Sequence, residues 1–174
     1  MKKFLLLLVV GVSMMFATSA SAQGYIKINP AGWAIGQFGL AYEGVVNEKS
    51  SFQVSANFFN YRLVDLSGFG GSVQYRFYLS SDDAPRGLFV APHVGINITT
   101  WKDDDGIFDN ESFTRLKIGA MIGYQWLFSD DKFSFELGIG PAYKLQLGDV
   151  SDRVTLGGNI GPIASLSLGY RLVE

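Results

Sequence analysis

The sequence predicts an all-β protein, folded as an eight-stranded antiparallel up-and-down transmembrane β-barrel. Beyond residue 22, apolar and polar residues alternate over long segments, and this period of two is typical of strands. The chain combines 21 glycines with an aromatic share of 14%, which disfavours helices because each Gly inside a helix costs about 1 kcal/mol relative to Ala. No apolar run after residue 22 approaches the roughly 20 residues of a spanning helix. Entry into a membrane would therefore require a closed barrel, whose backbone groups bond to one another.

Residues 1–22 are typical of a cleaved signal peptide. Two lysines precede an apolar stretch that is too short to span a bilayer, and Ala20-Ser21-Ala22 matches a small-residue cleavage site. We expect cleavage after Ala22 and one barrel domain at residues 23–174; the alternative is an uncleaved membrane anchor. Loss of the two leader lysines leaves 12 basic against 16 acidic residues, a net charge of −4, which argues against nucleic acid. The absence of cysteine excludes disulfides and thiolate metal sites.

Each expected strand places apolar residues on one face and small or polar residues on the other. The segment 133–147 is the clearest, because Phe133, Phe135 and Leu137 alternate with Ser134 and Glu136. The segment 25–29 is the weakest. In chain order, the strands are expected at residues 25–29, 34–46, 51–63, 69–79, 87–101, 114–128, 133–147 and 160–172.

The connections between these strands alternate in length. Residues 47–50 and 129–132 read as tight turns, whereas residues 102–112 and 148–159 are long and polar. Outer-membrane barrels have short periplasmic turns and longer external loops. If the tight turns are periplasmic, the strand from residue 34 runs downward, so a preceding strand must carry the chain up. This connectivity is the independent reason for a strand at residues 25–29.

The composition of the two faces indicates which one would meet lipid. Gly, Ala and Ser dominate the polar face, which suits a narrow lumen more than a water-facing sheet. Aromatic residues gather near one end of the apolar face, as in an aromatic girdle: Tyr42, Tyr75, Phe77, Tyr124, Trp126, Phe128, Phe133, Phe135 and Tyr170. The alternative is a soluble, lipocalin-like barrel with the faces reversed.

Several segments resemble a known family of small Bacteroidota-type outer-membrane barrels of unknown function. They are Ile26-Lys27-Ile28-Asn29-Pro30, residues 38–43, 47–51 and 75–79, Ala84-Pro85-Arg86-Gly87 and Gly123-Tyr124-Gln125-Trp126. More broadly, the chain resembles the eight-stranded OmpX, OmpW and OmpA-barrel class. One departure is the C-terminus, where Val173-Glu174 replaces the final aromatic residue that the assembly machinery usually reads.

Charged residues on the polar face are the first candidates for a functional site. We expect a lumen polar network of Lys27, Glu43, Arg76, His93, Arg115, Lys117, Glu136, Lys144 and Arg171. An eight-stranded barrel is only wide enough for side chains to fill it, so the two glutamates should bridge to basic neighbours. The functional alternative is a narrow path for anions or small solutes.

Two further features are weaker candidates for a functional site. His93 could act as a base in a lipid-modifying barrel enzyme, but no sequence-close Ser or acid supports it, so a hydrogen-bonded lumen residue is expected. Asp103, Asp105, Asp109 and Glu111 could hold a divalent cation weakly, although the spacing departs from a calcium loop and favours a solvated acidic loop. The sequence predicts neither a cofactor nor a confident metal site.

These observations predict an exported, porin-like protein of the bacterial outer membrane with a structural or surface-interaction role and without catalysis. Its expected partners are outer-membrane lipid, lipopolysaccharide and the barrel-assembly machinery, while a specific protein partner is not indicated. The alternatives are a transporter of small hydrophobic molecules and a soluble periplasmic ligand carrier.

Overall fold

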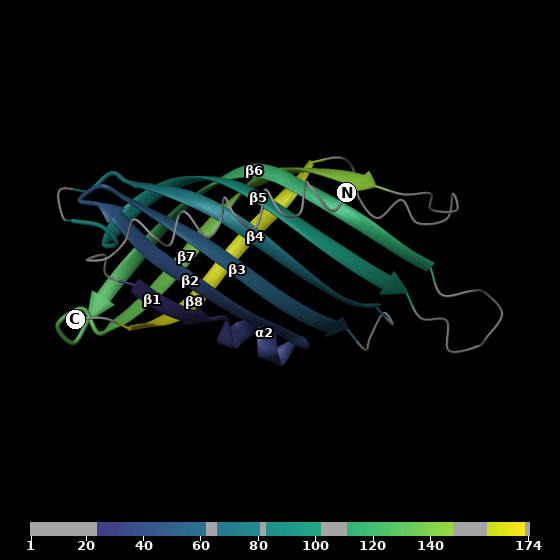
Figure 1. The fold of residues 1–174 in the computed structure, drawn as a ribbon, viewed down its shortest axis with the longest axis horizontal. Helices are drawn as coiled ribbons and strands as arrows, with labels where there is room; N and C mark the ends of the chain where they lie inside the picture. Colours follow the sequence, from purple (N-terminus) through teal and green to yellow (C-terminus); the bar gives the residue numbers. More distant parts are fainter. Residues whose placement is uncertain (1–23, 62–65, 81–82, 102–110, 148–159, 173–174) are drawn as a thin grey trace, which may run out of the picture.

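The computed structural model describes residues 24–61, 66–80, 83–101, 111–147 and 160–172 (Figure 1). Eight antiparallel strands follow one another around a closed barrel, and β1 pairs with β8 to close it. The strands are β1 (Gly24–Ile28), β2 (Gln37–Asn47), β3 (Ser50–Tyr61), β4 (Leu66–Tyr78), β5 (Gly87–Trp101), β6 (Glu111–Phe128), β7 (Phe133–Leu147) and β8 (Ile160–Arg171). The predicted eight-stranded antiparallel barrel is therefore confirmed. The signal peptide predicted at residues 1–22 lies outside the described residues.

The short N-terminal strand is essential to closure. β1 pairs with β2 through contacts such as Ile26 opposite Tyr42, and with β8 through Ile26 opposite Tyr170. The strand predicted from connectivity is thus confirmed, and β7 has the bounds that its alternation predicts. We call the end with the tight turns at residues 47–50 and 129–132 the turn end, and the opposite end the loop end.

A short helix between β1 and β2 was not predicted. α2 (Pro30–Ala34) begins after Asn29, whose side-chain Oδ1 accepts a hydrogen bond of 2.9 Å from the Gly32 amide. Asn is a preferred N-cap and Pro is favoured at the first helical position, so these residues start a helix. The strand predicted from residue 34 consequently begins at Gln37. α2 lies against the outside of the barrel and contacts β2 and β8 (Figure 1).

The helix also leaves a break in the barrel wall, which we call the seam. β1 ends at Ile28, which lies opposite Leu40 of β2 and Leu168 of β8. Toward the loop end, residues 160–167 of β8 and residues 37–39 of β2 continue without a β1 partner among the described strands. Along the seam, β2 and β8 are therefore neighbours that no β1 ladder joins.

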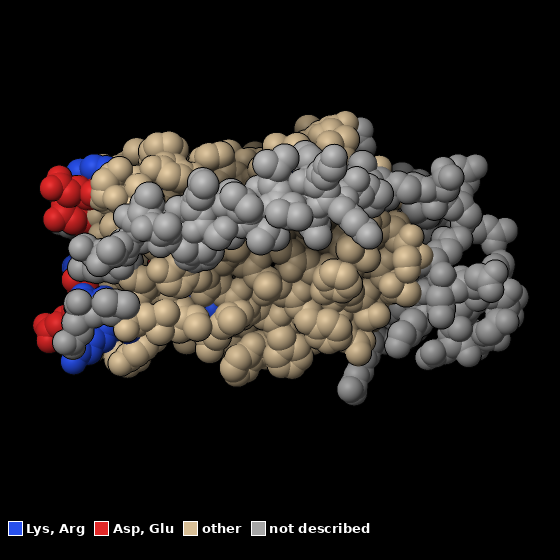
Figure 2. Space-filling view, viewed as in Figure 1, with Lys and Arg blue, Asp and Glu red and all other residues tan. Residues whose placement is uncertain are grey.

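The outer face is apolar, and the lumen is mostly polar. Side chains that point outward include Leu40, Phe69, Ile118, Ile139 and Leu168, all exposed. Figure 2 shows an almost uncharged surface between the two ends, with charged residues gathered at the turn end. The expected aromatic girdle residues form ring contacts with centroids 4.6–5.5 Å apart: Tyr75–Phe77, Tyr124–Trp126, Trp126–Phe135 and Phe133–Tyr170.

The apolar part of the lumen is small. One cluster of buried apolar residues consists of Tyr78, Ala84, Phe89, Ala91, Met121, Ala142 and Ile163, and Tyr25, Phe59 and Phe113 are buried as well. Within the described residues, no helix combines the length and apolar character needed to cross a membrane. Because the apolar part of the lumen is small, polar contacts must supply much of what holds the interior together.

Candidate functional site

Four buried charges meet in the lumen near the turn end, and we call them the charged plug. Lys27 Nζ lies 2.6 Å from Glu43 Oε2 and 2.7 Å from Glu136 Oε2. Arg76 Nη1 lies 2.7 Å from Glu136 Oε2 and 3.3 Å from Glu43 Oε1. All four side chains are fully buried. Two cations and two anions make the plug neutral, which is the condition under which buried charges are tolerated.

Strand parity explains why these side chains point inward. Each lies on the polar face of its strand, Lys27 on β1, Glu43 on β2, Arg76 on β4 and Glu136 on β7. Successive side chains of a strand point to opposite faces, so the apolar neighbours of these residues face outward. The plug therefore draws on strands from around the whole barrel.

Further hydrogen bonds satisfy the remaining oxygens of Glu43. The hydroxyls of Ser51 and Tyr78 donate to its Oε1 at 2.5 Å and 2.7 Å, and Gln125 Nε2 donates to its Oε2 at 3.1 Å. The Arg76 guanidinium also lies 4.6 Å from the centre of the Phe89 ring. Buried charges are costly unless they are hydrogen-bonded as well as paired. These contacts meet that requirement.

The plug and the aromatic side chains beside it close the lumen at the turn end. Tyr25, Tyr78 and Phe89 are at most 3% exposed. Tyr25 also donates from its hydroxyl to the backbone oxygen of Asp131 in the tight turn, at 2.7 Å. A solute moving along the barrel axis would have to displace this neutral, hydrogen-bonded layer.

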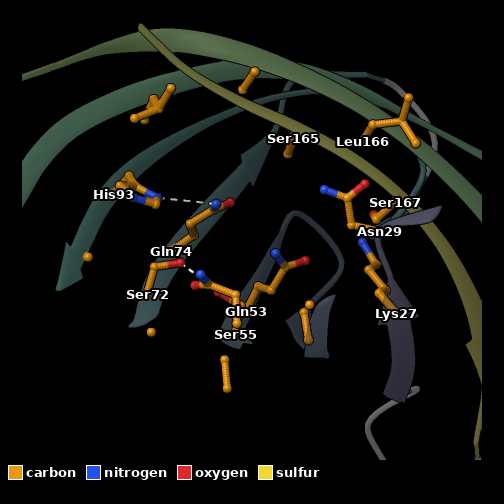
Figure 3. Close-up of a pocket in the computed structure, with 18 of the residues that line it drawn as sticks. Lys27, Asn29, Gln53, Ser55, Ser72, Gln74, His93, Ser165, Leu166 and Ser167 are labelled. Carbon is orange, nitrogen blue, oxygen red and sulfur yellow. Dashed lines mark hydrogen bonds between the residues drawn. The ribbon is translucent and has the colours of Figure 1, made fainter. Parts of the chain in front are cut away.

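A polar cavity of about 300 Å³ lies next to the plug, on its loop-end side. Figure 3 shows Gln53, Ser55, Ser72, Gln74 and His93 on one side of it. Across the cavity are Lys27, Asn29 and Ser167. Gln74 Nε2 lies 3.3 Å from His93 Nδ1, and the hydroxyls of Ser55 and Ser72 are 2.7 Å apart. The cavity wall is thus rich in amides and hydroxyls.

The nine residues predicted for the lumen network do not form one cluster. Lys27, Glu43, Arg76 and Glu136 meet in the plug, and both glutamates bridge to bases there. His93 and Lys117 line the cavity. The remaining three lie elsewhere. Arg115 lies 5.2 Å from the centre of the Phe113 ring, and Lys144 lies on β7, opposite Lys117 of β6. Arg171 lies opposite Tyr25 at the turn end.

Sequence reasoning missed the uncharged members of the site. Gln125 accepts a hydrogen bond of 2.7 Å from Lys27 and donates to Glu43, so it belongs to the plug. Gln53 and Gln74 line the cavity. Each of these glutamines is on the polar face of its strand, where parity could have indicated it. The predicted network contains only charged residues and His93, although buried amides also form hydrogen bonds.

The weaker candidates gain no supporting geometry. Within the described residues, the hydrogen bond of the His93 ring goes to Gln74, which cannot activate it as a base. Of the possible cation ligands, Asp103, Asp105 and Asp109 lie outside the described residues. Glu111 was expected in the preceding loop but begins β6. No group of three or more potential metal ligands occurs in the described part of the chain.

The fold and the plug together define a class, the small closed eight-stranded barrels with an apolar exterior and a polar, side-chain-filled lumen. Residues 4–150 match the model of a family described as a protein of unknown function (DUF3575), and the chain belongs to this family. Comparisons with curated proteins and with solved structures found no match.

Proposed function

We propose that the protein is a small outer-membrane β-barrel with a structural or surface-interaction role. The observation that supports this proposal is the distribution of side chains, which is the reverse of that in a soluble protein, because apolar residues face outward and charged residues are buried. Ile139, Phe69 and Leu40 on the outer face are 61%, 58% and 53% exposed, while the four plug side chains are fully buried. A barrel that faces lipid needs this arrangement.

The same distribution argues against a soluble carrier. Monomeric soluble proteins rarely expose a continuous apolar patch of more than a few hundred Å². Here apolar residues cover the outside of every long strand. A lipocalin-like carrier would place them around a ligand inside the barrel. Aromatic residues near one end of the outer face further favour a bilayer, because such rings settle at the membrane interface.

The charged plug argues against an open axial pore. Lys27, Glu43, Arg76 and Glu136 fill the turn end of the lumen and are held by short contacts of 2.6–3.3 Å. The barrel would then act through its surfaces. Its outer face would contact lipid, its loop end would meet lipopolysaccharide or other envelope components, and the barrel-assembly machinery would insert it.

A transporter of small hydrophobic molecules is the second candidate. The seam between β2 and β8 favours it, because a break in the ladder offers a route through the wall rather than along the axis. The likeness to the OmpX, OmpW and OmpA-barrel class is compatible with either role. Neither candidate requires catalysis.

Single-cysteine labelling tests both the membrane location and the orientation. The natural chain has no cysteine, so each introduced thiol is unique. Lys132→Cys places an exposed thiol at the turn end, and Asn60→Cys places one near the loop end of β3. A membrane-impermeant maleimide should label Asn60→Cys in whole cells and Lys132→Cys only after the outer membrane is permeabilised.

The cysteine labelling must be combined with membrane fractionation and with heat-modifiable gel migration, which reports whether the barrel is folded. Equal labelling of both variants in whole cells would contradict the proposed orientation. Recovery of the mature chain as a folded monomer in the detergent-free soluble fraction would contradict the membrane location and favour the carrier.

A further inference from the structure

We propose that the lumen cavity binds the anionic, hydroxyl-bearing head group of a single-chain amphiphile, whose acyl chain leaves the barrel sideways through the seam between β2 and β8. This inference rests on the proposed membrane location, because the chain would emerge where lipid is expected. It adds a ligand class and a binding site to the structural role.

The first step is that the cavity reaches the barrel wall at the seam. Its lining includes Leu40 on β2 and Ala164 and Leu166 on β8, all of which belong to the outward faces of their strands. Asn29 and Gln37, which flank α2 where the β1 ladder ends, line the cavity as well. The cavity therefore extends to the outer side where the β1 ladder is missing.

The second step is that an apolar groove continues from the seam on the outside. This groove, of about 490 Å³, is lined by Ile35 after α2, by Ile122 on β6 and by Leu137 and Ile139 on β7. It shares five lining residues with the cavity: Asn29, Gln37, Ala164, Ser165 and Leu166. The polar cavity and the apolar groove thus adjoin each other at the seam, an arrangement that matches the two halves of an amphiphile.

The third step concerns charge. The plug cations are neutralised by the plug glutamates, but Lys117, which also lines the cavity, is not. Within the described parts of the chain, no Asp or Glu forms an ion pair with Lys117, or with Arg115 and Lys144 on the same side of the lumen. Partly buried cations without a partner favour an anion, and a phosphate or carboxylate head group supplies it.

The fourth step is an unsatisfied acceptor. Gln53 lines the cavity and is only 6% exposed, yet among the described residues its Oε1 has no hydrogen-bond partner. Buried polar atoms are normally paired, so a donor from a bound molecule is expected there. A hydroxyl on the head group would donate to Gln53 Oε1 while the anionic oxygens face Lys117. A glycerol phosphate head group carries both functions.

Three probes separate the contributions of head group and chain. Palmitoyl lysophosphatidic acid has the glycerol phosphate head group and one acyl chain, glycerol 3-phosphate has only the head group, and monopalmitoylglycerol has the chain with a neutral head. We would measure binding to the full mature barrel in a non-ionic detergent by native mass spectrometry, after heat-modifiable migration has shown that each sample is folded. Lysophosphatidic acid should bind at least tenfold more tightly than either partial probe.

Two variants test the head-group end and the acyl-chain end of the proposed site separately. Lys117→Met removes the charge and should weaken lysophosphatidic acid binding at least tenfold without affecting monopalmitoylglycerol. Ala164→Trp should obstruct the exposed mouth of the passage and weaken both lipids. The matched controls are Lys132→Met at the exposed turn and Val73→Trp on the outer face of β4, both outside the cavity and groove. These controls should bind like the unmodified barrel.

Several outcomes would overturn the inference. Glycerol 3-phosphate binding as tightly as the lysophospholipid would identify a site for a free anion. Unchanged binding in both Lys117→Met and Ala164→Trp would show that the lipid adheres elsewhere on the barrel. A folded barrel that binds none of the probes overturns this inference alone, whereas a chain that never forms a heat-modifiable barrel in detergent overturns the proposed function as well.

Discussion

Removing one carboxylate from the charged plug should destabilise the barrel far more than removing an exposed one. Glu136→Gln keeps the size of the side chain but removes its charge and replaces one acceptor oxygen by an amide donor. The variant leaves Lys27 and Arg76 facing Glu43 alone, so a fully buried layer that was neutral acquires a net positive charge.

The contacts of Glu136 indicate how large the loss of stability should be. Glu136 accepts hydrogen bonds from both terminal nitrogens of Arg76 at 2.7 Å and 2.9 Å, from Lys27 at 2.7 Å and from Ser165 at 2.8 Å. Breaking a buried ion pair from one side costs about 3–5 kcal/mol, because the remaining charge is left uncompensated. We therefore expect the free energy of unfolding to fall by about 3–5 kcal/mol in Glu136→Gln.

The matched control is Asp131→Asn, which makes the same chemical change in an exposed pair. Asp131 Oδ1 lies 2.5 Å from Arg86 Nη2, with side chains 36% and 42% exposed. Solvent screens such pairs, and their contribution is about 0–1 kcal/mol. A second variant, Lys27→Met with Glu136→Gln, restores neutrality and should recover more than half of the loss.

Unfolding by urea in phospholipid vesicles would measure these differences, with gel migration as one probe and fluorescence of the three tryptophans as the other. The reasoning is refuted if Glu136→Gln lies within about 1 kcal/mol of the unmodified barrel, or if it costs no more than Asp131→Asn. It is also refuted if restoring neutrality in the double variant gives no recovery.

Two further predictions follow from the same geometry. The unmodified barrel should pass no measurable current in a planar bilayer. Arg76→Ser with Glu136→Ser should introduce ion conductance, because it removes two of the four large charged side chains that fill the turn end. A double variant without conductance would contradict the role of the plug. Gly140→Ala should lower the midpoint of urea unfolding by the equivalent of about 1–3 kcal/mol, since its Cβ would collide with a backbone oxygen of β6. Gly71→Ala should lower stability less, because its Cβ would lie 3.1 Å from the backbone oxygen of Ser55 on β3. Equal effects at the two glycines would contradict the packing argument.

The fold could be predicted because every long strand has two different environments. Alternation marks those environments directly, so residues 133–147 gave the bounds of β7. Connectivity predicted the existence of β1, whose five residues carry little pattern of their own and which lies one residue earlier than the predicted segment 25–29. α2 could not be found in this way, because Trp33 and Ile35 look like outward residues of a strand. The one local signal was Asn29-Pro30, which caps and starts the helix.

Parity tells which side chains enter the lumen but not how far along the axis each one lies. The stagger of successive strands sets that height, and it accumulates around the barrel. Glu43 and Glu136 therefore meet Lys27 and Arg76, while Lys144, equally inward, does not join them. No feature of the sequence alone separates these basic residues into plug and cavity.

The arrangement of charge along the lumen follows from this stagger. The described acidic side chains of the lumen, Glu43 and Glu136, both form their ion pairs within the plug at the turn end. The cations on the loop-end side, Arg115, Lys117 and Lys144, are left without acidic partners among the described residues. The described part of the interior is thus closed and neutral at one end and cationic toward the other. A solute drawn in by this field would be an anion, and since the plug blocks the axial exit, it would have to stay in the cavity or leave through the seam.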